Sequence, residues 1–337
     1  MITRDQIYTM LKLRNRENTV FSDLPDDLIR EISDHGQAPN TGIATALKYA
    51  AYARKEDVKA LLVLLDEDPS LLLQAGNVQT PGGDEVRRVT LYEFLLGAGD
   101  FELAGIVQSY FANIDNGEQE RIRQYERYRP HIESMLTQKP YNLGPLIQLI
   151  KDATPEQVTA LLNKDMTGED DLCTAIKKFR KDWAPKVLTK PCMHYNYNSF
   201  KHALELLDLE LNNLQKANNF DKINLIKRLL IGFEMRRFPG IDRCVMAQGL
   251  YYVIEENEPL TRTYTRRINC RQAPAFPITV SDDSNDGLGV DYYIRVEVAT
   301  LWGDRPAVSC FRTHVEQKKS NLQNLCNQPQ LISRSGV

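Results

Sequence analysis

The sequence contains no long apolar run. No stretch of its 337 residues approaches the about 18 consecutive apolar residues that a membrane-spanning helix needs. Its first residues, MITRDQIYTMLKLRNREN, are charged and amphipathic, unlike the apolar centre of a secretory signal peptide. We therefore expect a soluble, unprocessed protein without a membrane span.

Cysteine pairs with metal-binding or redox spacing are also missing. The chain is large enough to build its own core without disulfides, so the sequence predicts reduced thiols and a cytosolic setting. The six cysteines are scattered at Cys173, Cys192, Cys244, Cys270, Cys310 and Cys326. The motifs G-x-x-x-x-G-K-[ST], G-x-S-x-G and H-E-x-x-H are absent too, so nucleotide hydrolysis and familiar hydrolase chemistry receive no support.

A strong charge of either sign is the third absence. The 42 basic and 45 acidic residues give a formal net charge of -3, which offers no electrostatic case for a nucleic-acid partner. A local basic run includes Arg262, Arg266, Arg267 and Arg271. We interpret this run as a solvated surface.

A short amphipathic helix is predicted from Leu24 in the segment FSDLPDDLIREI. Pro25 suits the first turn of a helix, where its missing N–H costs nothing, and the acids that follow suit the positive end of the helix dipole. Gly36 then provides a stop. One apolar face carries Leu24, Leu28, Ile29 and Ile32. This face is large for so short a helix and requires something to pack against.

Two later segments are similar to each other, one from Thr45 and the other from Thr90. Both resemble ankyrin repeats, in which a threonine opens the first helix, a glycine ends it and an acid begins the second. Gly99 provides that glycine in the second copy, whereas Arg54 stands there in the first. Residues 77–88, NVQTPGGDEVRR, form the surplus between the copies, and we expect them to bulge from a hairpin tip.

Helical periodicity continues after the repeats. Thr154 begins one predicted helix, and apolar positions at helical spacing mark others over 200–214, 223–233 and 241–256. Beyond Pro259 the apolar period changes to two, first in 294–298 and again in AVSCFRTHV from residue 307. The sequence therefore predicts strands there, and a short or frayed last helix from Lys318 onward.

These patterns predict a mainly α protein with ankyrin-like helical repeats, a helical bundle and a small α+β C-terminal region. We expect four parts: N-terminal helices with the Leu-Pro motif in 1–36, repeats in 37–140, a helical domain in 141–258 and a small β-containing region in 259–337.

Residues Phe21 to Ile32 resemble the first half of an F-box. Together with the repeats, and with the segments QERIRQYERYRP and FEMRRFPGIDRCVMAQGLYYV, they are similar to ankyrin-containing effectors of Legionella-like intracellular bacteria. The resemblance implies an adaptor that recruits a host Skp-cullin ubiquitin ligase to an ankyrin-bound host protein, after transfer from the bacterial to the host cytoplasm. The implied partner-binding residues are Leu24, Pro25, Asp27, Leu28, Ile29 and Ile32. It implies no cofactor, metal or catalytic residue.

Other interpretations stay open. The Leu-Pro helix could cap the exposed end of the repeats instead of docking on a ligase, because the first repeat begins where an F-box would continue. The chain could also tether or sequester a host protein without any ligase. A third alternative is an enzyme whose chemistry lies in the C-terminal half.

Other segments carry residue types that occur in catalytic, metal-binding or anion-binding sites. Cys192 with His194, and Cys310 with His314, are thiol–imidazole pairs that we interpret as packing residues rather than nucleophiles. Residues 281–292, SDDSNDGLGVDY, resemble a calcium loop but lack the closing glutamate, so a solvated turn is favoured. Around Pro239, a cluster comprises Arg236, Arg237 and Arg243. This cluster is either an anion-binding notch or an elbow whose arginines pair with Glu234, Asp242 or Glu256 on the surface.

Overall fold

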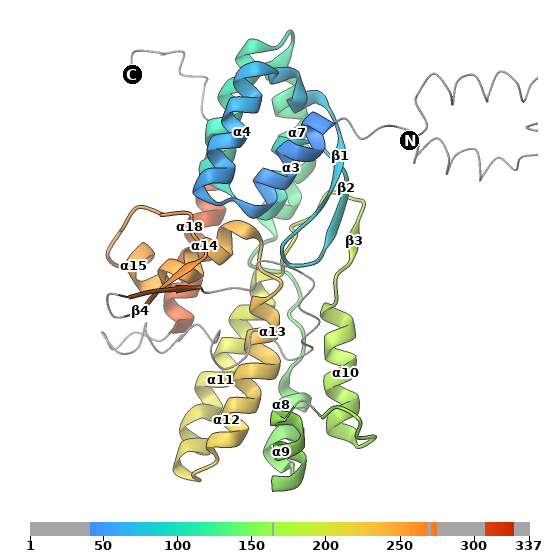
Figure 1. Cartoon of the computed structure of the whole chain (residues 1–337), viewed down its shortest axis with the longest axis vertical. Helices are drawn as coiled ribbons and strands as arrows, with labels where there is room; N and C mark the ends of the chain where they lie inside the picture. Colours follow the sequence, from blue (N-terminus) through green and yellow to red (C-terminus); the bar gives the residue numbers. More distant parts are fainter. Residues whose placement is uncertain (1–40, 164, 269–270, 275–306, 327–337) are drawn as a thin grey trace, which may run out of the picture.

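The computed structural model describes residues 41–163, 165–268, 271–274 and 307–326, and within these ranges the chain is mainly helical. Figure 1 shows an elongated body with one group of helices at the top, another at the bottom and a smaller group between them. In the described part of the chain, no helix is both long enough and apolar enough to cross a membrane.

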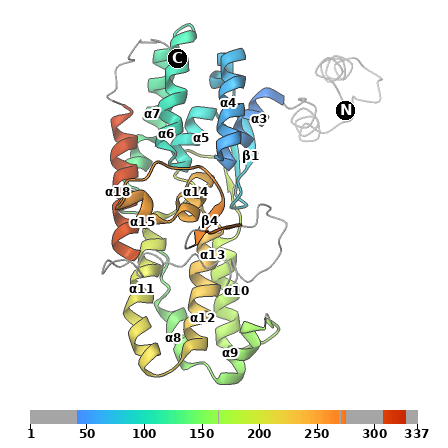
Figure 2. The ribbon, with the colours of Figure 1, turned by 60° about the vertical axis from the view of Figure 1, so that its left-hand side comes forward.

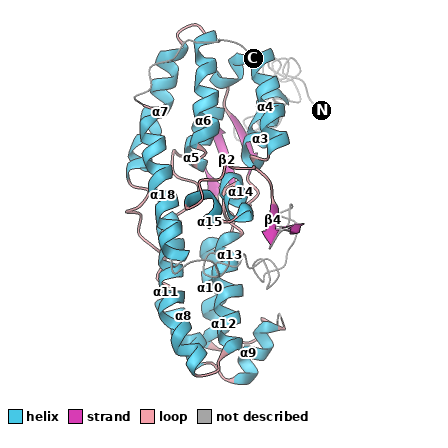
Figure 3. Cartoon of the chain, turned by 90° about the vertical axis from the view of Figure 1, so that its left-hand side faces the viewer, coloured by secondary structure: helices cyan, strands magenta, loops and turns pink. Residues whose placement is uncertain are grey.

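The upper group contains two helix pairs separated by a β-hairpin. Its elements are α3 (Thr41–Tyr52), α4 (Lys55–Glu67), η1 (Pro69–Leu73), β1 (Gly76–Gln79), β2 (Glu85–Val89), α5 (Leu91–Ala98), α6 (Phe101–Gln108), η2 (Ser109–Asn113) and α7 (Gly117–Glu133). α3 and α5 face inward, because apolar residues such as Leu47 and Leu95 are fully buried there. Figure 3 shows α4, α6 and α7 around this core.

The turns inside the two helix pairs have similar backbone conformations. Gly99 ends α5 with a left-handed φ of 73°, and Asp100 then caps α6 by accepting a hydrogen bond from the N–H of Leu103 at 3.1 Å. In the first pair, Ala53 adopts φ 57° and Arg54 begins the next helix. The non-glycine turn expected from Arg54 therefore exists, but the left-handed residue is Ala53.

The hairpin tip is buried rather than solvated. Pro81, Gly82 and Gly83 are all buried, and the backbone carbonyls of the first two accept hydrogen bonds from Arg243 at 2.6 Å and Arg237 at 3.1 Å. Residues 77–88 therefore form the predicted hairpin tip, and this tip packs into the protein. The glycines allow a close approach: a Cβ on Gly82 would lie 2.7 Å from the carbonyl oxygen of Arg237.

The lower group consists of helices that follow residue 140 and the short strand β3. Its elements are α8 (Gly144–Asp152), α9 (Pro155–Leu162), α10 (Asp171–Trp183), β3 (Val187–Leu188), α11 (Tyr197–Lys216), α12 (Phe220–Ile226), the π-helical turn η3 (Lys227–Ile231) and α13 (Gly232–Met235). Thr154 caps α9 as predicted. Strand β3 adds to the upper hairpin in parallel to β2, with Glu85 opposite Val187. The sheet therefore joins the two groups.

The middle group contains α14 (Gly240–Gln248), α15 (Leu250–Ile254), the hairpin strands β4 (Thr265–Ile268) and β5 (Arg271–Pro274), and α18 (Ala307–Asn324). The single helix expected over 241–256 is broken at Gly249, whose φ is 101°. In Figure 2, α18 runs along one side of the molecule from α7 above to α11 below. Its residues thus pack against both groups.

The strand predicted for AVSCFRTHV is wrong, because this segment forms the first half of α18. Its buried side chains recur at helical rather than alternate positions: Cys310, Phe311, His314, Val315, Lys318, Leu322 and Leu325. Two of these buried residues, His314 and Lys318, are polar. A search for apolar periodicity alone therefore misses the buried face of this helix. The strand expected over 294–298 lies outside the described residues.

The two left-handed turn residues provide a matched test. We expect Gly99→Ala to destabilise the protein by about 1–2 kcal/mol or more, because L-residues disfavour this conformation and a Cβ would lie 2.8 Å from the Lys318 Cδ. Ala53→Gly should be nearly neutral, since relief of the same strain is offset by the lost burial of one methyl group. Urea unfolding midpoints measure both. Equal destabilisation by the two changes would contradict this account of the turns.

Candidate functional site

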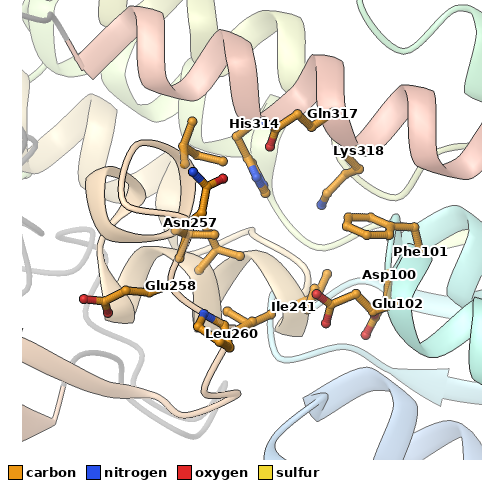
Figure 4. Close-up of a pocket in the computed structure, with 14 residues that line it drawn as sticks. Asp100, Phe101, Glu102, Ile241, Asn257, Glu258, Leu260, His314, Gln317 and Lys318 are labelled. Atoms are coloured by element: carbon orange, nitrogen blue, oxygen red, sulfur yellow. The ribbon is translucent and has the colours of Figure 1, made fainter.

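A cavity of about 210 Å³ opens between the start of α6 in the upper group and the elements of the middle group. Figure 4 shows its walls: α18 on one side, the start of α6 on another, and α14 with the segment that follows α15 on the third. Phe101, Ile241 and Leu260 give it an apolar lining, whereas His314 and Lys318 point into it from α18. Buried charge beside an apolar cavity makes this the strongest candidate site in the described residues.

The polar wall is organised by the carboxylate of Asp242, in the first turn of α14. Its Oδ1 forms an ion pair with Lys318 Nζ and lies 3.2 Å from His314 Nε2. Its Oδ2 accepts a hydrogen bond from the Tyr197 hydroxyl at 2.8 Å. Lys318 Nζ also donates to that hydroxyl, at 3.0 Å. We call these four residues the Asp242 cluster. It joins α14, α18 and the first residue of α11.

Burial and charge act in opposite directions within the Asp242 cluster. Burial raises the pKa of Asp242, but the opposing effect of Lys318 and His314 is larger. The pKa of Asp242 therefore lies below the ordinary value, and the group is ionised. Burial lowers the pKa of His314, although Asp242 acts the other way, so the imidazole is neutral at pH 7. Burial together with Asp242 holds the pKa of Tyr197 well above its usual range. The cluster therefore holds one positive and one negative charge.

A second ion pair borders the same cavity. The Arg262 guanidinium donates to both carboxylate oxygens of Asp100, at 2.8 and 2.9 Å, and to Glu102 at 3.1 Å. The interpretation of Arg262 as a solvated surface residue is therefore wrong, since its side chain is only 11 % exposed. Bidentate pairing to a helix-capping aspartate fixes the segment after α15 on the start of α6. The side chains of Arg266, Arg267 and Arg271 lie outside the described residues.

The polar groups in the described lining of this cavity are carboxylates, amides, an imidazole and an ammonium. Among the described residues that line the cavity, none is a serine, threonine or cysteine. The groups that could contact a small ligand are the Lys318 ammonium, the His314 ring and the carboxylates of Glu102 and Glu258 at the rim. Lys318 already forms an ion pair with Asp242. Most of its charge is therefore compensated within the protein and not by a ligand.

The thiol–imidazole pairs form no nucleophilic site. The Cys310 thiol is buried and lies 3.9 Å from a Glu255 oxygen, while His314 turns to Asp242. Burial raises the pKa of Cys192, and burial lowers the pKa of His194 to about 3. The His194 ring packs on Phe94, with ring centroids 5.0 Å apart. The five cysteines in the described ranges are free thiols.

The arginines around Pro239 are not the surface elbow that was one of the expected alternatives. Arg243 donates to the carbonyls of Phe238, Pro81 and Arg236, and Arg237 donates to those of Trp183 and Gly82. Two of the acids expected as their partners bind other residues. Asp242 pairs with Lys318, and Glu256 accepts a hydrogen bond from the Tyr251 hydroxyl. Main-chain oxygens in the hairpin tip are the partners that the sequence could not show.

The residues predicted to bind a partner lie outside the described ranges: Leu24, Pro25, Asp27, Leu28, Ile29 and Ile32. The segment considered as a calcium loop, 281–292, also lies outside them. Among the described residues, no group of three or more histidines, cysteines or acids is placed to hold a metal ion. Comparison with protein-family models, curated proteins and solved structures finds no match to this chain.

Replacing Lys318 tests the Asp242 cluster. We expect Lys318→Met to cost about 3–5 kcal/mol of stability, because it leaves the buried Asp242 carboxylate without its cation. Lys319→Met is the control: this neighbouring lysine donates only to the Glu133 carbonyl at an exposed position, so its loss should cost about 1 kcal/mol or less. Urea unfolding at pH 7 measures both.

The ion pair of Asp242 and Lys318 should make the stability of the protein depend on pH in the acidic range. Because the folded pKa of Asp242 is lowered, its contribution is complete above the unfolded pKa of about 4 and is lost as the pH falls further. The loss of stability in Lys318→Met should therefore shrink below pH 4. An equal loss of stability for Lys319→Met, or no loss of stability for Lys318→Met, would contradict this account of the Asp242 cluster.

Glu234 in α13 gives a pH effect of the opposite sign. Its side chain is fully buried, its two carboxylate oxygens have no hydrogen-bond partner among the described residues, and burial raises its pKa well above the ordinary value. Stability is therefore fully retained below the unfolded pKa of about 4.3 and falls as the pH rises, by up to about 1.4 kcal/mol per unit.

Glu234→Gln should remove this pH dependence and stabilise the protein at pH 8 more than at pH 5, as unfolding midpoints at the two values would show. Glu67→Gln, at an exposed position, is the control and should change neither midpoint. A Glu234→Gln variant with the same pH profile as the parent would show that the carboxyl is ionised in the folded state.

Proposed function

We propose that the chain is a non-catalytic interaction protein that binds a protein partner through its ankyrin-like helix pairs. The observation that carries this proposal is the order of the upper group: helix pair, β-hairpin, helix pair. α3 and α4 are joined by a left-handed residue, Ala53, and α5 and α6 by Gly99. Such units stack and present variable surfaces that suit protein recognition.

The Leu-Pro segment supplies the second half of the proposal. Leu24, Leu28 and Ile32 would bind the Skp-type subunit of a cullin ligase in the host cytoplasm, while the repeat surface holds a host target. A chain that binds both proteins at once raises the effective concentration of the target near the ligase. Burying the four apolar side chains of this face, Leu24, Leu28, Ile29 and Ile32, on binding could contribute about 1.5–3 kcal/mol each, against an association cost of about 4–15 kcal/mol.

The buried hairpin tip limits which part of the upper group can meet a target. Because Pro81 and Gly82 are bound by Arg243 and Arg237, the tip is not a free finger. The outer helices remain accessible, since Val63 on α4 and Ile106 on α6 are among the exposed large apolar residues. For the same reason a fragment of residues 141–337 would lose its packing against the tip. The full chain is therefore the right material for functional tests.

The discriminating experiment is Leu28→Asp in the full chain, measured by Skp co-precipitation from host lysate and by thermal unfolding. Docking predicts that Skp binding is lost while the melting temperature changes little. Arg30→Asp places the same carboxylate on the expected polar face of the helix and should leave binding intact.

Two other outcomes would reject the ligase proposal. A large fall in melting temperature for Leu28→Asp would identify the segment as a cap of the repeats. No Skp binding by the parent chain would leave the alternative of a binding module that tethers a host protein without a ligase.

A further inference from the structure

A second and larger cavity, of about 700 Å³, lies between the hairpin tip and the lower group. Its walls come from segments far apart in the sequence: Asp84 at the tip, the connection 138–141 between α7 and α8, the end of α10, the residues on either side of β3, and Arg237 after α13. We call it the lower cavity. Its volume is in the range that small-molecule sites occupy.

Positive charge exceeds negative charge in the lower cavity. Among its described lining residues, the cations are Lys139, Lys181, Lys186 and Arg237, and the acids are Asp84 and Asp182. Asp182 is already paired with Lys178, which does not line the cavity, at 3.2 Å. Burial raises the pKa of Asp84, so its charged form is itself disfavoured there. Asp84 still acts on Arg237 and Lys186, and Asp182 acts on Lys186, but four cations face two acids and the cations remain in excess.

The arginine at the back of the lower cavity is short of compensating charge. Burial and the neighbouring Arg236 lower the pKa of Arg237 to about 10, although Asp84 acts in the other direction. The Arg237 guanidinium donates to the carbonyls of Trp183 and Gly82, which satisfy N–H groups but carry no full negative charge. An anion in the cavity would supply the missing charge, and arginine binds phosphate oxygens with favourable geometry.

Aromatic rings form another part of the wall. Tyr141 and Trp183 are half-buried and Tyr195 is buried. The rings are held by edge or tilted contacts, with Tyr141 5.3 Å from Phe179 and Trp183 5.8 Å from Tyr195 between centroids. Rings fixed in this way offer surfaces on which a planar base can stack. The Gln138 amide lies in the same wall and can bind polar edges, whereas the Asn196 amide is held by the Lys139 carbonyl and the Ser199 N–H.

We propose that the lower cavity binds a nucleoside phosphate, with the phosphate facing Arg237, Lys181 and Lys186 and the base against Trp183 and Tyr141. The site requires both halves of the molecule, because the hairpin tip holds Arg237 in place through the Gly82 carbonyl. It is separate from the Asp242 cluster and independent of the proposed ligase recruitment. A ligand here would stabilise the joint between the upper and lower groups.

Trp183 provides a direct probe. The chain has two tryptophans, so Trp302→Phe leaves Trp183 as the single emitter. We expect saturable quenching of its fluorescence by AMP, ADP or ATP, with weaker effects of adenosine or inorganic phosphate alone. Titration calorimetry on the parent chain provides a second readout that does not depend on the substitution. Absence of binding by all three nucleotides up to about 1 mM, a weak affinity by any standard, would overturn the proposal.

Charge reversal locates the site. The double variant Lys181→Glu/Lys186→Glu changes two exposed lining residues and should raise the Kd at least about tenfold while leaving the melting temperature of the free protein unchanged. Lys190→Glu is the matched control, because Lys190 is exposed on the loop after β3 and does not line the cavity. Equal weakening by the control would overturn the site. Adenosine binding as tightly as the nucleotides would overturn the phosphate contact, and phosphate binding as tightly would overturn base stacking.

Discussion

The carboxylate of Asp242 is the constraint on which the joint between the middle and lower groups depends. It is nearly inaccessible to water, and an isolated charge there would be very costly. Lys318 and His314 from α18 and Tyr197 from α11 provide the counter-charge and hydrogen bonds. The C-terminal helix therefore belongs to the core, although it is joined to the rest of the chain through residues 275–306, which lie outside the described ranges.

A second set of buried polar contacts acts at the hairpin tip. The guanidinium groups of Arg237 and Arg243 bind main-chain oxygens of the tip, and β3 extends the hairpin into a sheet shared by the two groups. Gly240, at the start of α14, approaches the carbonyls at the end of α3 so closely that a Cβ would collide with them. Upper and lower groups are thus joined by specific contacts, and the hairpin serves this joint before it can serve a partner.

Local features of the fold could be predicted from the sequence, but long-range contacts could not. The sequence predicts helix starts at Thr90 and Thr154, and both threonines form capping boxes. The strand predicted over 307–315 failed because His314 and Lys318 occupy buried positions that a pattern of apolar residues treats as exposed. Their spacing of four, beside Cys310, Phe311 and Val315, was the available signal for a helix with a polar buried face.

The candidate sites were harder to predict for a related reason. Asp242 and His314 were both noticed, but as a surface acid and as a partner of Cys310, since nothing local pairs residues 72 positions apart. The sequence shows the arginines around Pro239 as a cluster, and one interpretation of it is an anion-binding notch. Arg237 from this cluster lines the lower cavity. The predicted partner-binding residues 24–32 remain a prediction, because they lie outside the described part of the chain.

The central claim is that buried polar contacts make the repeat-like upper group and the lower bundle one cooperative unit. Native-state hydrogen exchange, followed by mass spectrometry in low concentrations of denaturant, tests it most directly. The account predicts that peptides from α5, α11, α14 and α18 lose protection together, with a single free energy of opening. Protection that persists in α3 to α7 under conditions where α11 and α18 have fully exchanged would contradict it.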